Sequence, residues 1–382
     1  MLLSEFKFNT RLYIVNFFKL SNSKYFCFWF VSFYLLNFVS CINYGPVSLK
    51  SERSRYNLAI QKTNDEQLLL NLVRLKYRDT PFFMEVSNIA SQFSLKSQAS
   101  ISAQLESIVE DIFNIGASAS YVESPTVSYS PLQGDKFVKN ILSTIPLKTI
   151  ALLFHSGWSV ERIFRVLFQT LNELENAPGA SGPTPKLAPN YRAFLKAIYY
   201  LQELDNRDTL SIFYQEPDGQ PQLVLKISNK DKNSKEAHAF ARAMNVTPGQ
   251  TKFILNYFPN PDQKKHIRIT PRSFLGVMFY LCQSIEVPEQ DVKNGKVTLT
   301  HDSNGDRFDW SNVTGDLLTI KFSKEKPFRS STYISYRDTW FYIDDIDLES
   351  KSTFQLLMQI YSLQSGSIKS SEPILTIGVG RN

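Results

Sequence analysis

The chain of 382 residues has few of the side chains that bind metals or form disulfide bonds: it contains three cysteines and four histidines. Cys27 and Cys41 lie near the start, so Cys282 is the one cysteine in the long remainder of the sequence. None of the histidines has a second histidine or a carboxylate at the spacing of a metal motif. We therefore expect no metal site and no disulfide bond between residues 42 and 382.

The sequence also lacks the motifs of common enzymes. It has no Gly-x-Ser-x-Gly, no Walker A motif and no Gly-x-Gly-x-x-Gly. The segment Asp302–Asp306 resembles the start of a calcium loop, but Arg307 stands where the loop needs glycine, and Val313 where it needs a bidentate glutamate. This segment is more typical of a hairpin turn. These absences favour a protein without a cofactor and without enzymatic activity.

A strong excess of charge is missing as well. The formal net charge is +6, and residues 42–382 contain 38 basic and 35 acidic side chains. Nucleic-acid binding depends on a concentrated positive charge that neutralises phosphates. The charge balance therefore predicts no nucleic-acid partner.

Residues 26–40 form an apolar run that only Ser32, Asn37 and Ser40 interrupt, and Lys19 and Lys24 precede it. The run is shorter than the roughly 20 apolar residues of a membrane-spanning helix. Its length and basic flank are those of a signal peptide.

The end of this run, Phe38-Val39-Ser40-Cys41, resembles the bacterial lipobox. The resemblance implies that residues 1–40 are removed and that Cys41 becomes a lipidated first residue. Its acyl chains would exceed the two signals that stable anchoring requires. Ile42, rather than aspartate, implies sorting to the outer membrane, where we expect the protein to face the periplasm. The alternative is an uncleaved signal anchor with an unmodified Cys41.

The rest of the sequence predicts an α+β fold, in which a helical N-terminal part precedes a mixed, largely antiparallel sheet with packed helices. We expect a tether at 41–55, a helix-rich region at 56–175 and an α+β region at 191–382. Residues 176–190, rich in proline and glycine, predict a linker or a long surface loop. Other expected elements are helices at 56–77, 105–115, 160–175 and 271–285, and strands at 82–86, 91–104, 117–130, 296–300 and 332–343.

An acidic cluster follows the expected strand at 340–343 and precedes a helix that starts near Ser350. Its members are Asp344, Asp345, Asp347 and Glu349. Carboxylates at a strand end can bind Mg²⁺ or act as acid and base. They are also the residues that a helix N-terminus prefers, which is the interpretation we favour.

A basic cluster, Arg74, Lys76 and Arg78, lies where the first helix is expected to end. Cations complement the negative end of a helix dipole, which explains the cluster without any ligand. A contact with a lipid headgroup or with the cell wall is the sharper alternative. Nearby, Tyr77-Arg78-Asp79-Thr80 matches Tyr336-Arg337-Asp338-Thr339, a similarity that we interpret as coincidence.

Three phrases of the sequence resemble an uncharacterised family of proteobacterial outer-membrane lipoproteins: 65–75, 77–81 and 340–345. The resemblance implies a location and no activity. The first hypothesis is a lipid-anchored binding or structural component of the envelope with an unidentified envelope or cell-wall partner. The second is a lipid-tethered hydrolase or transferase that uses the acidic cluster near Asp345. The third is a subunit of an outer-membrane pore or secretion assembly, in which segments 91–104 and 117–130 pair with other copies.

Overall fold

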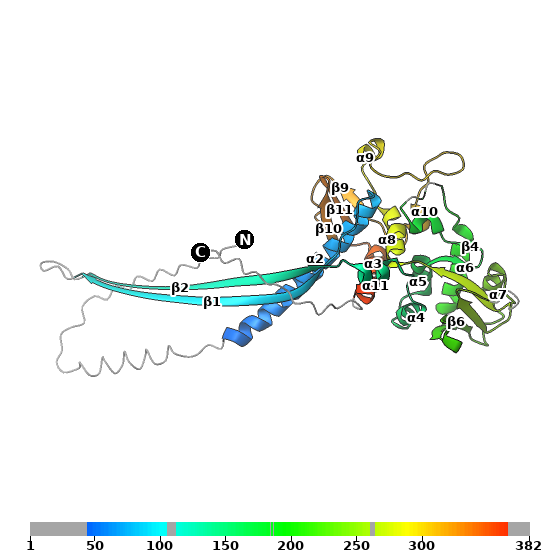
Figure 1. Cartoon of the computed structure of the whole chain (residues 1–382), viewed down its shortest axis with the longest axis horizontal. Helices are drawn as coiled ribbons and strands as arrows, with labels where there is room; N and C mark the ends of the chain where they lie inside the picture. Colours follow the sequence, from blue (N-terminus) through cyan, green and yellow to red (C-terminus); the bar gives the residue numbers. More distant parts are fainter. Residues whose placement is uncertain (1–43, 105–111, 184, 186, 260–263, 366–382) are drawn as a thin grey trace. The chain divides into compact units, whose positions relative to one another are not determined.

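The computed structural model describes residues 44–104, 112–183, 185, 187–259 and 264–365 (Figure 1). It is a mixed α+β protein with mostly antiparallel sheets, as the sequence predicts. The chain divides into two compact units. Of the described residues, the first contains 44–59 and Val86–Tyr129, and the second contains Ile60–Glu85 and 130–365.

The first unit holds the start of helix α2 (Tyr44–Lys76) and a long two-stranded sheet of β1 (Met84–Gln104) and β2 (Ile112–Pro131). The helix begins at Tyr44, so most of the expected tether at 41–55 is helical. The two strands expected at 82–86 and 91–104 are one continuous strand. Residues 112–115 of the expected helix at 105–115 are strand, and residues 105–111 lie outside the described residues. Pro125 does not interrupt β2, because a strand with one neighbour has backbone N–H groups that need no partner strand.

The second unit is built around a six-stranded sheet with the order β4-β3-β8-β7-β6-β5. All neighbours are antiparallel except β7 and β8, which run parallel. The strands are β3 (Phe168–Leu171), β4 (Leu174–Glu175), β5 (Leu210–Gln215), β6 (Gln222–Ile227), β7 (Lys252–Asn256) and β8 (His266–Pro271).

Helices pack with this sheet around a continuous apolar core. Three serines, Ser159, Ser234 and Ser273, are the N-caps of α5, α7 and α8, where each hydroxyl accepts a bond from a backbone N–H of the first turn. The helices are α3 (Asp135–Leu142), α4 (Leu147–His155), α5 (Val160–Leu167), α6 (Arg192–Asp205), α7 (Lys235–Ala243), α8 (Phe274–Leu281), α9 (Glu289–Lys293), α10 (Ser311–Thr314) and α11 (Leu348–Ser365). Within the described ranges, no helix combines the length and the apolar character that crossing a membrane requires.

Some expected elements differ from the observed ones. The helix expected at 160–175 ends at Leu167, because Phe168–Leu171 pairs with β8 instead. The helix expected at 271–285 begins at Phe274, after Pro271 at the end of β8 and the Ser273 cap, and ends at Leu281, where a 3-10 turn at Cys282–Ser284 follows. Residues 296–300 form no strand. The segment 176–190 lies within the second unit, where Asn176, Ala177 and Ala180 are fully buried, rather than between two units.

The strand expected at 332–343 is a hairpin of β10 (Ser330–Tyr336) and β11 (Thr339–Asp344), which pairs with β9 (Lys321–Ser323) in a three-stranded antiparallel sheet. Its two-residue turn is Arg337-Asp338, with φ of 49° and 60°. Positive φ at both positions defines the type I′ turn that suits the twist of a hairpin. The sequence signal was weak, because asparagine and glycine are the usual residues there.

Two amide side chains of α2 hold the start of β1. Asn71, which is fully buried, donates to the carbonyl of Phe82 over 2.8 Å and accepts from its N–H over 2.9 Å. Gln67, one helical turn earlier, makes the same two bonds to Met84, at 3.0 and 2.7 Å. Residues four apart on a helix share a face, as do residues two apart on a strand. The two amides therefore act as a short substitute for a neighbouring strand.

Candidate functional site

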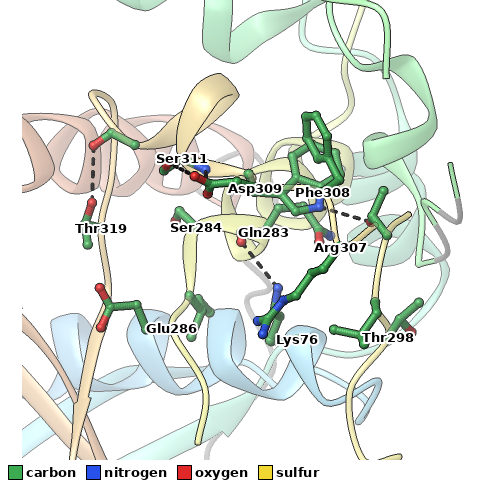
Figure 2. Close-up of a pocket in the computed structure, with 15 residues that line it drawn as sticks. Lys76, Gln283, Ser284, Glu286, Thr298, Arg307, Phe308, Asp309, Ser311 and Thr319 are labelled. Carbon is green, nitrogen blue, oxygen red and sulfur yellow. Dashed lines mark hydrogen bonds between the residues drawn. The ribbon is translucent and has the colours of Figure 1, made fainter. Parts of the chain in front are cut away.

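A cavity of about 390 Å³ lies in the second unit, where the end of α2 meets the turn after α8 and the segment 298–311 (Figure 2). Polar and charged side chains make up most of its lining. The residues around it are Lys76, Gln283, Ser284, Ile285, Glu286, Thr298, Leu299, Thr300, Arg307, Phe308, Asp309, Trp310, Ser311, Gly315 and Thr319.

Lys76 is the last residue of α2 and is half-buried in this cavity. Its ammonium Nζ donates to the backbone carbonyl of Gln283 over 3.3 Å. Burial lowers the pKa of Lys76 because the charged form loses hydration, and the nearby Arg307 lowers it further by repulsion. The surroundings of Lys76 therefore disfavour the charged form of its side chain.

The neighbouring Cys282 does not neutralise Lys76. Its thiol is buried and free, and burial raises the thiol pKa to about 12. It is therefore protonated and uncharged at neutral pH. Cys282 also donates to the carbonyl of Phe279, a structural contact within α8 and its end.

Arg307 reaches the cavity from the turn at 302–306. The Asp302 carboxylate accepts bonds from the backbone N–H groups of Asn304 and Asp306, and Gly305 supplies the required φ of 88°. A turn was the interpretation that the sequence favoured for this segment over a calcium loop. Figure 2 shows the guanidinium of Arg307 beside the end of Lys76. Its partner is Glu289, at 3.0 Å, and both of these side chains are exposed.

The carboxylates of the cavity are directed elsewhere. Asp309 accepts bonds from the N–H and the hydroxyl of Ser311, at 2.9 and 2.7 Å. Figure 2 shows Glu286 pointing away from Lys76, and its charge acts on Lys321. Two cations thus lie together in the cavity, with no carboxylate of its lining on Lys76.

A second cavity of about 760 Å³ shares Arg307, Phe308 and Asp309 with the first. Its lining adds acidic residues, Glu173, Glu175 and Asp302. The segment 307–309 therefore separates a cavity with a basic pair from a more acidic one.

The predicted acidic cluster lies outside both of these cavities. Asp347 accepts bonds from the N–H of Ser350, at 3.0 Å, and from its hydroxyl, so it caps the start of α11. The other three carboxylates form ion pairs: Asp344 with Lys321, Asp345 with Lys351 and Glu349 with Arg162. This arrangement supports the capping interpretation for Asp347, and each of the other three carboxylates contacts a basic side chain.

The two Tyr-Arg-Asp-Thr segments, interpreted above as coincidence, contact each other. Asp79 accepts bonds from the hydroxyl of Tyr336 and from Arg337, the latter at 2.8 Å. Arg337 also lies over the rings of Tyr77 and Tyr336, at 5.0 and 5.5 Å. The contact joins the end of α2 to the β10–β11 hairpin and has an evident structural role.

Other predicted site residues can be placed only in part. The lipidation candidate Cys41 and the signal segment 1–40 lie outside the described residues. Within the described part of the chain, no group of three or more histidine, cysteine, aspartate or glutamate side chains could hold a metal ion. The sequence pattern singles out Lys76 but not its proximity to Arg307. In the sequence, Arg307 stands out only as the residue that breaks the calcium motif.

Comparisons with protein-family models, with curated proteins and with solved structures gave no match.

Proposed function

We propose that this protein is a lipid-anchored component of the bacterial outer membrane, facing the periplasm, that assembles with further copies of itself through its long hairpin. The anchor rests on the apolar run at 26–40 and on Phe38-Val39-Ser40-Cys41. The assembly rests on the hairpin of β1 and β2. This proposal joins the structural role with that of a subunit in a multi-copy envelope assembly.

The observation that carries the proposal is the length and isolation of this sheet. Its strands have 21 and 20 residues, which corresponds to roughly 65 Å of extended chain. In the described part of the chain, β1 and β2 pair with each other and with no other strand. Most strands are far shorter, and an isolated two-stranded hairpin is marginally stable in water. Such a hairpin gains stability by pairing with something else.

A second copy is the partner that fits the two open edges. One edge belongs to β1 and the other to β2, so β1 of one copy can pair with β2 of the next. This head-to-tail contact repeats from copy to copy and closes when the rotation allows a ring. Lysines, prolines and bulges usually protect such edges, and here each strand carries few of them: Lys96 in β1, and Pro125 and Pro131 in β2. The charged residues of the two strands are Glu85, Lys96 and Glu123.

The anchor is tested by intact mass and membrane fractionation of the wild type and of Cys41→Ser. We expect the wild type to carry the mass of a triacylated Cys41 and to pellet with outer membranes, whereas the variant is soluble or unprocessed. If both proteins keep Met1 and an unmodified Cys41, residues 26–40 are a signal anchor and the lipoprotein proposal fails.

The assembly is tested by native mass spectrometry of the full chain, purified from membranes in mild detergent. We expect a defined oligomer whose mass is a whole multiple of the protomer mass. A monomer at every protein concentration would contradict assembly while leaving the anchor untouched.

A further inference from the structure

We propose that the cavity beside Lys76 binds a phosphate group, held between the ammonium of Lys76 and the guanidinium of Arg307. The site does not depend on the proposed assembly. It would give the protein a ligand of its own, either a soluble phosphate monoester or the headgroup of a phospholipid.

The first argument is the unbalanced charge. Lys76 and Arg307 lie side by side in a half-buried cavity (Figure 2). Like charges that share a partly desolvated site repel each other. Among the described residues, Lys76 has one hydrogen-bond acceptor, the neutral carbonyl of Gln283. An anion between the two cations removes the repulsion and fills the remaining ammonium donors.

The second argument is that, among the described residues, no carboxylate lies between the two cations. Asp309 uses both carboxylate oxygens on Ser311. Glu286 points away from Lys76 in Figure 2. Glu289 contacts Arg307, but both side chains are more than half exposed. An exposed ion pair of this kind is weak, about 0–1 kcal/mol, so a ligand can compete with it.

The third argument is the match of charge and size. A phosphate monoester carries a charge of about −1.5 to −2 at neutral pH. It therefore neutralises two cations more completely than a single carboxylate would. The planar fork of arginine and the point charge of lysine are both common phosphate ligands. The cavity of about 390 Å³ falls within the range of small-molecule sites, about 300–1,000 Å³.

The sequence pattern around Lys76 explains why the cation is placed there. The preceding turn of α2 buries Leu72, Val73 and Leu75 in the core, and Tyr77 follows as a buried ring. The hydroxyl of Tyr77 bonds to Asp291, which also pairs with Lys296. The backbone on both sides of Lys76 is therefore fixed, and its side chain is directed at the cavity.

The test is isothermal titration calorimetry of the full lipidated chain in detergent with glycerol 3-phosphate, with sodium acetate at equal ionic strength as the control ligand. We expect binding of the phosphate ester and none of acetate. Lys76→Gln and Arg307→Gln should each weaken binding at least tenfold. The exposed Arg329→Gln, outside both cavities, is the matched control and should bind as the wild type does.

The source of the phosphate is distinguished by a second arm. The same proteins without their lipid, as Cys41→Ser variants, are sedimented with phosphatidylcholine vesicles that contain phosphatidic acid or lack it. Binding that requires phosphatidic acid and is lost in Lys76→Gln supports a lipid headgroup, and binding of glycerol 3-phosphate alone supports a soluble ligand. If neither probe binds, or if Lys76→Gln and Arg307→Gln bind as tightly as Arg329→Gln, the phosphate site is refuted. Circular dichroism melts of each variant establish that it is folded.

Discussion

Arg272 is a fully buried charge that no carboxylate of the described residues contacts. Its guanidinium donates to the carbonyls of Arg165, Val166 and Phe168, at 3.1, 3.1 and 2.6 Å, and also to that of Asn176. It also lies 3.9 Å from the ring centroid of Tyr280. Burial lowers the Arg272 pKa to about 10, so the side chain remains charged at neutral pH. These bonds cap the end of α5 and hold the start of the 176–190 segment.

We expect Arg272→Met to destabilise the protein by at least about 3 kcal/mol. Each buried acceptor that loses its donor costs roughly 1–3 kcal/mol, and several lose it together. The measurement is the free energy of unfolding in urea, with the exposed Arg329→Met as control. A loss of less than about 1 kcal/mol would mean that water replaces the guanidinium and that Arg272 does not hold these segments.

His266 makes stability depend on pH. Both of its ring nitrogens are buried without a hydrogen-bond partner among the described residues. Burial lowers the His266 pKa below its usual 6.5, and Lys265 adds to the shift. The unfolded chain therefore binds the proton more readily than the folded chain does. The free energy of unfolding thus rises with pH between the lowered pKa of the folded chain and the usual value of 6.5.

We expect the free energy of unfolding to fall as pH decreases from 7.5 to 5.5, and to fall less in His266→Asn. The exposed His155→Asn should keep the pH dependence of the wild type. Urea titrations at several pH values provide the measurement. Equal slopes for the wild type and His266→Asn would show that another group causes the dependence.

At the scale of the element, α11 depends on its cap. Asp347 accepts from the N–H and the hydroxyl of Ser350, whereas the exposed Asp345 accepts from the ammonium of Lys351 at both its carboxylate and its backbone carbonyl. Loss of an N-cap costs typically about 1 kcal/mol, and loss of an exposed ion pair costs less. We expect Asp347→Ala to lower stability by about 1 kcal/mol and Asp345→Ala by under about 0.5 kcal/mol.

Chemical denaturation of these two variants also bears on the acidic cluster as a catalytic site. Removal of a catalytic carboxylate often stabilises a protein, because carboxylates gathered at a site repel one another. A gain of stability in Asp347→Ala would contradict the capping role. It would return the cluster to consideration as a functional site.

Elements were predictable where local signals decide them. The sequence predicts helices at 135–142 and 234–244. The helix α3 has the first of these bounds, and α7 lies one residue inside the second at each end, because apolar spacing and, for α7, the Ser234 cap are encoded within each segment. The helix expected at 160–175 failed at Phe168, where pairing with β8, about 100 residues later in the chain, outweighs local helix preference. The candidate site could not be predicted for the same reason. Lys76 and Arg307 are far apart in sequence, and no motif spacing links them.

At the scale of the whole molecule, the hairpin is divided between the two units. Its root, where the chain enters at 82–85 and leaves at 130–132, belongs to the second unit, and residues 86–129 belong to the first. The N–H of Leu132 donates to the carbonyl of Phe83 over 2.9 Å, so the chain enters and leaves the hairpin at adjacent points. Phe83 is buried and stacks on Tyr361 of α11. Together with the Asn71 and Gln67 bonds, these contacts anchor the root without using residues 86–129.

We therefore expect the second unit to survive removal of the hairpin. In the variant, residues 86–129 are replaced by Asn-Gly, which favours the two-residue turn needed to join Glu85 to Ser130. Thermal melting by circular dichroism should show a cooperative transition close to that of the wild type, because the core contacts of Phe83 remain. Native mass spectrometry should show monomers in place of the oligomer, since both open edges are gone. If the oligomer persists, the copies associate through the second unit and the hairpin has another partner. If the transition disappears, the hairpin is part of the folding core rather than an extension from it.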